Sequence, residues 1–491
     1  MFEVTTMRAR ILHLAAVLLG GLVLWAPAPF GSVYGWAHTV LRVMACAIVA
    51  VALVARTRWP REAGLAALAL AAVALLGLAQ SVSWPAPVAR FLAPRLATQW
   101  QKAQSPGTTA GWVPLSLSPQ ETRSFALTWA AVAACGLAAA VAGRQRTGRR
   151  ILGGALIVSG LFQVFYGTQS WMGSGRIWGR EVANSAERLR GTFINADHFA
   201  MYLELVLPVV FAAGWWAFRR VKKEPLERKV LIAGPAVLAW LTLFVGLAFS
   251  GSRAGLVAGL FAASMQGLLI ASTVKQWRPG LSGVLAIGMG GLAVAFIGLQ
   301  EGLGRWLATS RFELTWNARL DVYARTIELW QRFPLLGTGL ATFREAFPTV
   351  QQAASPGAWW HAHNDYLEVL ATTGIVGAIL VGLAVFWVVK GLLRTLRDGH
   401  HTEDRCAAVA ALGALAAVAI HSCFDFGLTM PANAATLAIL CGLGLAAGEQ
   451  QAVAATPEQP RSTPPPRPRQ PERHHHHHRS RPPLKEPFDL R

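Results

Sequence analysis

Blocks of roughly twenty mainly apolar residues recur along the chain, separated by short polar segments. A block of this length can cross a bilayer as a helix, and the blocks are too long and too numerous for the core of a water-soluble protein. We count about twelve of them. They begin near Ile11, Val33, Ala63, Ser124, Ile151, Phe199, Val230, Ala254, Leu281, Tyr366, Arg405 and Pro431. The pattern predicts an all-α, polytopic membrane protein with about twelve transmembrane helices.

Composition agrees with this prediction, and the basic residues orient the spans. Of the 491 residues, 53% are hydrophobic and 14% are charged, and the mean hydropathy is +0.39. Lys and Arg gather in alternate loops, which predicts that these loops and both termini are cytoplasmic. The clusters are Arg56–Arg61, Arg144–Arg150, Arg219–Lys229, Lys275–Arg278 and Lys390–Arg397. Because anionic lipid headgroups account for the net charge of +20, we expect membrane lipids and no nucleic acid as partners.

With this orientation, four segments face the side opposite the cytoplasm. They are residues 81–123, 171–197, 250–253 and 300–365. The last contains Leu320, Tyr323, Ile327 and Trp330 at helical spacing, which predicts an amphipathic helix at the interface, ending near Pro334. The chemistry of the protein is expected on this outer face.

The chain divides into three parts by composition. Residues 1–189 form N-terminal transmembrane helices, and residues 190–448 form a membrane core that includes the outer loop 300–365. Residues 449–491 are rich in Pro, Arg and His and are expected to be a disordered cytoplasmic tail. The five cysteines have no close metal-ligand spacing, and we expect them to act as small packing residues.

Several outward-facing helix starts carry residues suited to an anion. Asn195 or Asp197 can cap one helix close to Arg190, and Ser252 can cap the next, with Arg253 in its first turn. Helix N-termini carry partial positive charge, and arginine adds a bidentate fork for phosphate oxygens. The combination favours a lipid-linked diphosphate as ligand. The alternative is that Arg190 and Arg253 anchor their helices at the headgroups.

Histidines flank a third helix start in the segment Trp359-Trp-His-Ala-His-Asn-Asp-Tyr-Leu-Glu368. His363 can move a proton near neutral pH, although a structural role at the interface is equally consistent with its position. Asp365 and Glu368, three residues apart, resemble a capping box. A metal site at His361, His363 and Asp365 is disfavoured, because the helix start should turn Asp365 away.

Two further polar groups lie at or within the spans. His421 and Asp425 close a late span on the outer side, where they could join the same site or form an interhelical hydrogen bond. Glu204 lies about two turns inside a span, which suggests either function or an ion pair with a buried arginine.

Taken together, these strings resemble the O-antigen ligase and O-antigen or exopolysaccharide polymerase family. The resemblance covers roughly Arg190 to Pro431. Its parts are Arg190-Gly-Thr-Phe-Ile-Asn195, Ser250-Gly-Ser-Arg253, the helix of Arg319 running into Pro334-Leu-Leu-Gly-Thr-Gly339, and His363-Asn-Asp-Tyr-Leu-Glu368 followed by Thr373-Gly-Ile-Val-Gly377. Residues 195–198 read Asn-Ala-Asp-His where the family often has Asn-Pro-Asn or Asn-Arg-Asn, which leaves the roles of Asp197 and His198 open.

The resemblance implies a metal-independent, inverting membrane glycosyltransferase of the GT-C type, without a cofactor, in the bacterial inner membrane. Its donor would be a glycan on undecaprenyl diphosphate, and its acceptor at the periplasmic face would be lipid A-core or a second lipid-linked glycan. Carried onto this chain, Arg190 and Arg253 bind the diphosphate and His363 assists the acceptor hydroxyl. Candidate substrate-binding residues are Arg319, His361, Asn364 and His421. Ligase and polymerase are poorly separated, and a lipid-linked oligosaccharide flippase and a protein O-oligosaccharyltransferase are the alternatives.

Overall fold

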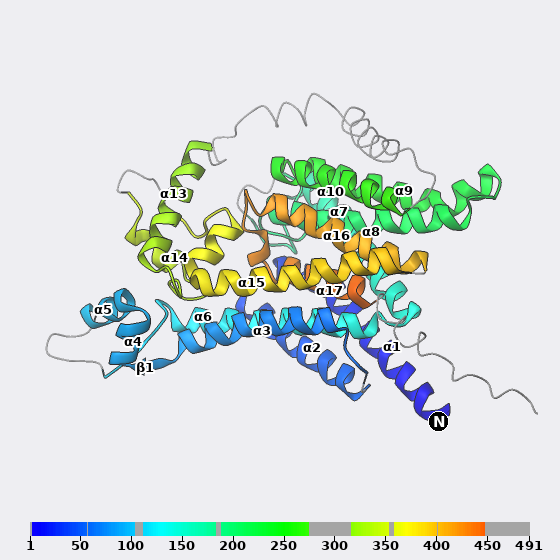
Figure 1. The fold of residues 1–491 in the computed structure, drawn as a ribbon. Helices are drawn as coiled ribbons and strands as arrows, with labels where there is room; N and C mark the ends of the chain where they lie inside the picture. The colour runs from blue at the N-terminus through cyan, green and yellow to red at the C-terminus, as the bar shows by residue number, and fades with distance from the viewer. Residues whose placement is uncertain are drawn as a thin grey trace, which may run out of the picture. The chain divides into compact units, whose positions relative to one another are not determined.

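The computed structural model describes residues 2–55, 57–103, 111–182, 188–273, 316–352, 358–399 and 401–446. Within this part of the chain, ten helices are long and apolar enough to cross a membrane. They are α1 (Phe2–Trp25), α2 (Gly35–Val54), α3 (Arg61–Ser81), α6 (Pro119–Ala142), α7 (Arg146–Met172), α8 (Ala196–Arg220), α9 (Leu226–Phe249), α10 (Arg253–Ser272), α15 (Asp365–Asp398) and α16 (Thr402–His421). Ten of the expected spans are thereby confirmed (Figure 1).

The other two expected spans have different outcomes. The block at Leu281 lies outside the described residues, as do the start of the long outer loop and the tail 449–491. The block at Pro431 forms α17 (Pro431–Ala446), a buried helix of 16 residues packed against α6 and α16. A Cβ added at Gly442 would lie 2.1 Å from the Gly136 carbonyl oxygen, so small residues allow α17 and α6 to approach closely.

Polar contacts sort the helix ends into two sets. At one end, basic side chains join neighbouring helices: Arg149 lies 3.1 Å from Asp404, and Arg394 lies 3.0 Å from Glu62. At the other end, Gln80 at the end of α3 donates to the Leu336 carbonyl at 2.6 Å. This alternation agrees with the pattern of basic loops, and the assignment of the basic end to the cytoplasm remains a prediction.

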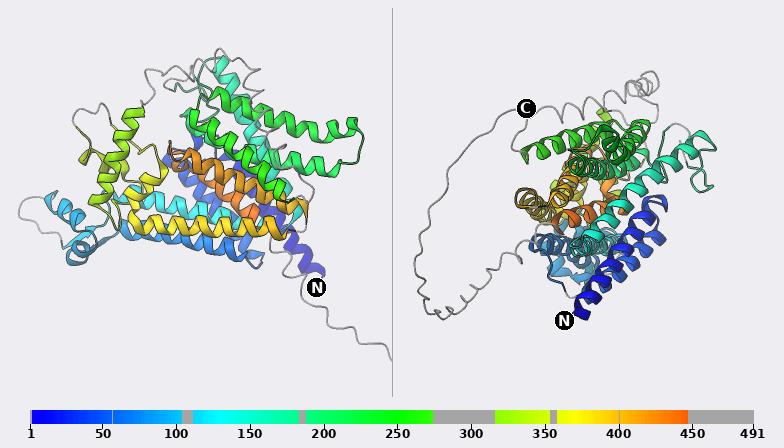
Figure 2. Two further views of the ribbon diagram at one scale, coloured as in Figure 1. Left: turned by 45° about the horizontal axis from the view of Figure 1, so that its top comes forward. Right: turned by 90° about the vertical axis from the view of Figure 1, so that its right-hand side faces the viewer.

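Short elements gather at the end opposite the basic one, where Figures 1 and 2 show α4, α5, α13 and α14 beside one another. They are η1 (Phe30–Ser32), β1 (Ser83–Pro85), α4 (Ala86–Leu92), α5 (Pro94–Lys102), β2 (Trp112–Pro114), α13 (Trp316–Arg332), α14 (Phe343–Ala346), η2 (Phe347–Thr349) and η3 (Gly427–Thr429). α13 confirms the expected helix, which ends just before Pro334. The antiparallel pair β1–β2 is a small correction to the all-α prediction.

A cluster of buried apolar side chains joins these short elements to one another. It includes Leu96 of α5, Val113 of β2, Leu329 of α13 and Phe343 of α14. Each of them is 1% exposed or less, which means that α13 is fixed to the outer end of the molecule by packing as well as by polar contacts.

α15 is interrupted near its start. Gly374 has φ +65° and ψ −171°, a conformation open to glycine and outside the helical region. The freed backbone groups find partners in the segment 334–339: Ile375 N donates to Pro334 O at 2.9 Å, and Gly339 N donates to Thr372 O at 2.9 Å. The turn that follows α13 thus docks into the break and separates residues 365–373 from the rest of α15.

Candidate functional site

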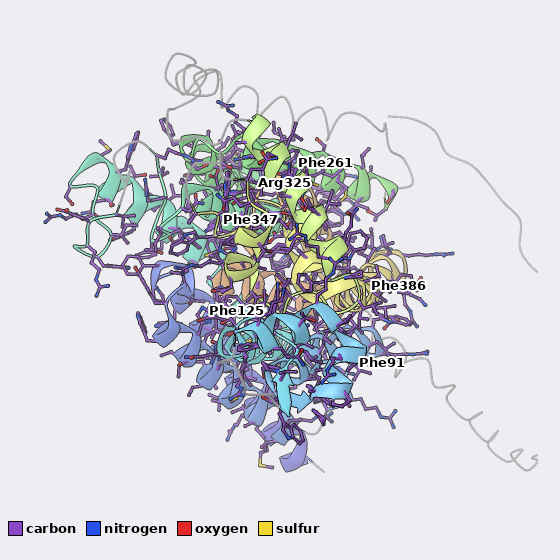
Figure 3. All side chains as sticks on the ribbon, turned by 90° about the vertical axis from the view of Figure 1, so that its left-hand side faces the viewer. Phe91, Phe125, Phe261, Arg325, Phe347 and Phe386 are labelled. Atoms are coloured by element: carbon purple, nitrogen blue, oxygen red, sulfur yellow. The ribbon has the colours of Figure 1, made fainter. Side chains whose placement is uncertain are left out.

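Four histidines converge on Asp425 and Phe426, the residues that follow α16. His198 comes from the first turn of α8, His361 and His363 precede α15, and His421 ends α16. The elements that carry them lie far apart in the sequence and meet at the outer end of the bundle, behind α13. Figure 3 views the molecule from this end, with Arg325 of α13 and Phe347 of η2 in front of the spanning helices.

The Asp425 carboxylate is the centre of this histidine cluster. Its Oδ1 lies 3.5 Å from His363 Nδ1, and its Oδ2 lies 3.6 Å from His198 Nε2 and 3.9 Å from His421 Nε2. These distances exceed those of direct hydrogen bonds, so the contacts are mainly electrostatic. One carboxylate therefore interacts electrostatically with three imidazoles.

The Phe426 ring separates the imidazoles and fixes their orientation. His361 stacks on it, with 4.0 Å between ring centroids and 11° between planes. His198 and His363 meet it edge-on at 4.6 and 4.8 Å. Because one rigid ring contacts three histidines, their relative positions are set by packing as well as by charge.

Two further carboxylates hold the outer members of the cluster. Glu204 Oε1 of α8 lies 2.8 Å from His421 Nδ1, and both side chains are fully buried. Glu368 of α15 accepts hydrogen bonds from His361 Nδ1 at 2.8 Å and from the Ala362 amide at 2.9 Å. The cluster is thus a connected network of imidazoles and carboxylates.

Exposure separates the four histidines into two pairs. The side chains of His361 and His363 are 26% and 20% exposed, whereas those of His198 and His421 are 7% and 0% exposed. A ligand arriving from the outer side can reach the first pair only. His198 and His421 lie deeper in the protein and influence the exposed pair through Asp425.

The charge of the network follows from its geometry. Burial alone would raise the pKa of Asp425, but the surrounding imidazoles outweigh burial and hold this pKa well below its usual range. Burial lowers the pKa of His361, and the Glu368 carboxylate reverses this effect, so that the net shift is upward. Near neutral pH, Asp425 is therefore an anion, and the Glu368 carboxylate shifts His361 toward its protonated form.

Helix α13 ties the two loops of the site together. The Tyr323 hydroxyl shares its one proton between the carbonyl oxygens of His363, at 2.9 Å, and Cys423, at 3.1 Å, and Arg319 donates to the Phe424 carbonyl at 3.1 Å. His363 has φ +50°, which is rare for a residue with a side chain, and these contacts help to stabilise it.

The start of α15 differs from the expected capping box. Asn364 is the N-cap, and its side chain accepts from Leu367 N at 3.0 Å and donates to Cys423 O at 3.0 Å. Asp365 instead accepts from the Ser422 hydroxyl at 2.7 Å, and Glu368 holds His361. The prediction of a capping box is therefore wrong, because the sequence does not reveal the contact of Asp365 with Ser422 or that of Glu368 with His361.

The arginines lie around the adjacent N-termini of α8 and α10. Asn195 caps α8 and Ser252 caps α10, both as predicted. Arg190 is buried and donates to Ile194 O at 2.9 Å, whereas Arg253 is exposed in the first turn of α10.

Arg188 connects the arginine region, which consists of Arg190, Arg253 and the N-termini of α8 and α10, to the histidine cluster. It forms a two-armed contact with the Asp197 carboxylate at 2.7 and 3.2 Å, and it donates to Ser250 O at 2.6 Å. Asp197 directly precedes His198 in α8. The N-terminus of α8 therefore belongs both to the arginine region and to the histidine cluster.

Comparison with known families shows what this arrangement belongs to. Residues 237–382 match the family model described as O-antigen ligase. Over these residues the chain is similar to the O-antigen ligase family. The match confirms the family resemblance seen in the motifs, and it indicates a multi-pass membrane protein with O-antigen ligase-like function and lipid-linked glycan substrates. A comparison with curated proteins found no match.

The region that matches the family model contains some of the site residues, and others lie outside it. Arg253, Arg319, His361, His363 and Asn364 lie inside the O-antigen ligase domain match. Arg190, His198, Glu204, His421 and Asp425 lie outside it, although the structure brings the last four into contact with the matched residues or with one another. The site therefore draws on helices before and after the matched region.

The structure brings together His361, His363, Asn364, Arg319 and His421, five of the predicted residues. Sequence reasoning missed the central role of Asp425, the His361–Glu368 pair and Arg188. For Arg188, the signal was an acidic residue in the first turn of the next helix, nine positions away. Among the described residues, no group of three or more His, Cys, Asp or Glu is arranged to hold a metal ion.

Proposed function

We propose that the protein is a membrane glycosyltransferase that moves a glycan from undecaprenyl diphosphate to a sugar hydroxyl on the periplasmic side of the bacterial inner membrane. The observation that carries the proposal is the position of His363 inside the O-antigen ligase match, accessible from outside and held beside a buried, ionised carboxylate.

In the proposed reaction, His363 accepts the proton of the acceptor hydroxyl. Asp425 next to Nδ1 favours the tautomer that carries its proton there, which leaves Nε2 as the base. As the imidazole becomes a cation, the nearby carboxylate stabilises it. General-base assistance of this kind contributes about 10²- to 10⁴-fold.

The hydroxyl oxygen then attacks the anomeric carbon, and the bond from that carbon to the diphosphate oxygen breaks. The reaction is a single displacement with inversion, and undecaprenyl diphosphate leaves as an anion. Arg253, exposed at the N-terminus of α10, and Arg190, beside the N-terminus of α8, supply positive charge for the diphosphate. No metal or cofactor takes part in the proposed step.

His361 and Arg319 take different parts in this proposal. His361 is paired with Glu368 and stacked on Phe426. As an imidazolium it stabilises negative charge on the leaving group, and it does not act as a second base. Arg319 and Asn364 bind backbone carbonyls of the α16 turn, and they position the two loops. His421 is buried and supports Asp425.

The test uses purified protein in lipid nanodiscs with an undecaprenyl-diphosphate oligosaccharide. One reaction contains lipid A-core as acceptor, and a second contains only further lipid-linked repeat units. We expect a new glycosidic bond and release of undecaprenyl diphosphate in one of the two, which separates ligase from polymerase.

The matched variants are His363→Ala and His13→Ala, the latter at an exposed position in α1. We expect the first to lose at least 100-fold in rate and the second to keep wild-type activity. Full activity of His363→Ala contradicts its role as base. Transfer of the donor across the bilayer of sealed proteoliposomes, without a new bond, would instead support the flippase alternative.

A further inference from the structure

A strongly basic cavity lies at the end of the molecule opposite the histidine cluster. It has a volume of about 830 Å³ and is bordered by the start of α7, the end of α8 and the start of α16. Six of its lining residues are basic: Arg146, Arg150, Arg219, Arg220, Lys222 and Lys223. Its volume is that of a ligand pocket, which is typically about 300–1,000 Å³.

The basic cavity has a large excess of positive charge. Two glutamates also line it: Glu403, which lies 3.0 Å from Arg150 and 3.8 Å from Arg146, and Glu224, which lies 2.8 Å from Arg228 outside the cavity. Six basic side chains against two acidic ones leave four positive charges. The basic residues 219–223 form no ion pair with another residue that the structure describes, so their charge is available to an anion.

The N-terminus of α16 adds to this field. His401 and Thr402 line the cavity, and no side chain caps the helix there. The partial positive charge of a helix N-terminus favours anions, and phosphate groups in particular.

An apolar groove adjoins the basic cavity and is bordered by the same three helices and by α17. The two share Arg150, Trp216 and Glu403. The groove has a volume of about 250 Å³ and is otherwise lined mainly by apolar side chains, among them Ile157, Val209 and Ala410.

Two glycines keep the groove open. A Cβ added at Gly153 or Gly154 would meet no atom within 4 Å. A larger side chain at either position would therefore occupy the groove without displacing the neighbouring helices.

Trp216 marks the boundary between cavity and groove. The Arg220 guanidinium lies 4.7 Å from the centroid of its ring, and that of Arg150 lies 6.0 Å away. Tryptophan prefers the level of the lipid headgroups, where its ring contacts apolar chains and polar groups together. The junction therefore lies where a lipid changes from headgroup to acyl chain.

We propose that the basic cavity and the apolar groove form one binding site for an anionic phospholipid, with its phosphate in the cavity and an acyl chain in the groove. Basic loops alone attract anionic headgroups anywhere along a membrane surface. Here the charge surrounds a concave space that continues into an apolar channel, and an amphiphile with a phosphate head and a long chain matches both parts.

The test uses the full-length protein in detergent with phosphatidylglycerol that carries a photoreactive diazirine in its acyl chain. Crosslinked peptides are identified by mass spectrometry. We expect labelling of α7, α8 and α16 around residues 153–157, 209–213 and 406–410, and at least fivefold less labelling with phosphatidylcholine of the same chains. Inorganic phosphate at millimolar concentration is expected to compete weakly, because it lacks the chain.

The charge variant is Arg219→Gln/Arg220→Gln, and its matched control is Arg58→Gln/Arg61→Gln, which removes the same charge at exposed positions outside the cavity. We expect the first to weaken phosphatidylglycerol binding about tenfold to thirtyfold, and the control to change it less than twofold. Gly154→Trp should block labelling in the groove while the basic residues remain.

Three results overturn the proposal. The first is equal labelling by phosphatidylglycerol and phosphatidylcholine, and the second is an equal loss of phosphatidylglycerol binding in the charge variant and its control. The third is displacement of the lipid by inorganic phosphate at a concentration equal to the dissociation constant of the lipid. The last identifies the cavity as a site for free anions. Because none of these measurements involves glycosyl transfer, their outcome is independent of the proposed activity.

Discussion

Replacing Asp425 with Asn removes the charge at the centre of the histidine cluster and keeps the size of the side chain. The carboxylate is 4% exposed and lies 3.5 to 3.9 Å from three imidazoles. At an effective dielectric constant near 20, a pair of charges 3.5 Å apart interacts by about 5 kcal/mol before desolvation. If 3 to 4 kcal/mol of this stabilises the cation that forms on His363 in the transition state, the rate falls by about 10²- to 10³-fold.

The assay measures turnover of lipid-linked donor by Asp425→Asn against wild type. We expect kcat to fall by that factor and KM for the donor to change less than threefold, because Asp425 lies beside His363, the proposed base for the acceptor. Asp425→Glu should recover part of the rate, since a charge returns at a shifted position.

The matched control is Asp404→Asn, which removes a buried carboxylate beside Arg149 at the basic end. It should lower the melting temperature and leave the rate per folded molecule unchanged. If Asp425→Asn folds normally and keeps activity within threefold of wild type, the carboxylate does not position or stabilise His363, and the reasoning from the network is refuted.

Three further perturbations test the fold and the network. Glu204→Gln leaves a buried imidazole without its carboxylate and should cost about 3–5 kcal/mol in stability, seen as a lower melting temperature. Gly337→Ala should destabilise the protein, because its φ is +72° and a Cβ would lie 2.3 Å from the Thr372 carbonyl carbon; Gly111→Ala, where a Cβ meets nothing, is the control. The raised pKa of His361 means that its pair with Glu368 stabilises the protein most below pH 6.5 and loses this contribution as pH rises through the higher folded pKa. The difference in melting temperature between wild type and His361→Asn should therefore shrink as the pH rises above 6.5, and a difference that grows with pH contradicts the assignment.

The spans, the amphipathic helix and two of the helix caps could be predicted because each depends on residues close together in the sequence. Apolar runs give α8 and α16, helical spacing gives α13, and Asn195 and Ser252 stand directly before their helices. For Glu204, the sequence suggests either a functional role or an ion pair with a buried arginine. The partner in the structure is His421, 217 residues away. A local pattern indicates that a buried acid needs a partner and contains no information about which distant residue supplies it.

Individual histidines of the cluster could be recognised in the sequence, but their arrangement around Asp425 could not. His363 and His421 stood out individually, but their shared contact with Asp425 depends on how the turn after α16 folds onto the start of α15. That fold is set by hydrogen bonds from Tyr323, Arg319 and Asn364 to backbone carbonyls. Carbonyl groups are present in every residue, so the sequence gives no sign of which ones are used.

In the proposed reaction, the length of α15 sets the height of the histidine cluster above the lipid. α15 has 34 residues, which at about 1.5 Å each give a length of roughly 51 Å, whereas the hydrocarbon layer is about 30 Å thick. Residues 375–389, between the break and the basic cluster Lys390–Arg397, give only about 22 Å, so apolar residues just before the break also contribute to the crossing. The first turn of α15, which begins at Asp365, then lies near the level of the headgroups. A polyprenyl chain can remain in the hydrocarbon while its diphosphate and first sugar stand at the level of the histidines, where a hydrophilic acceptor arrives without entering the membrane.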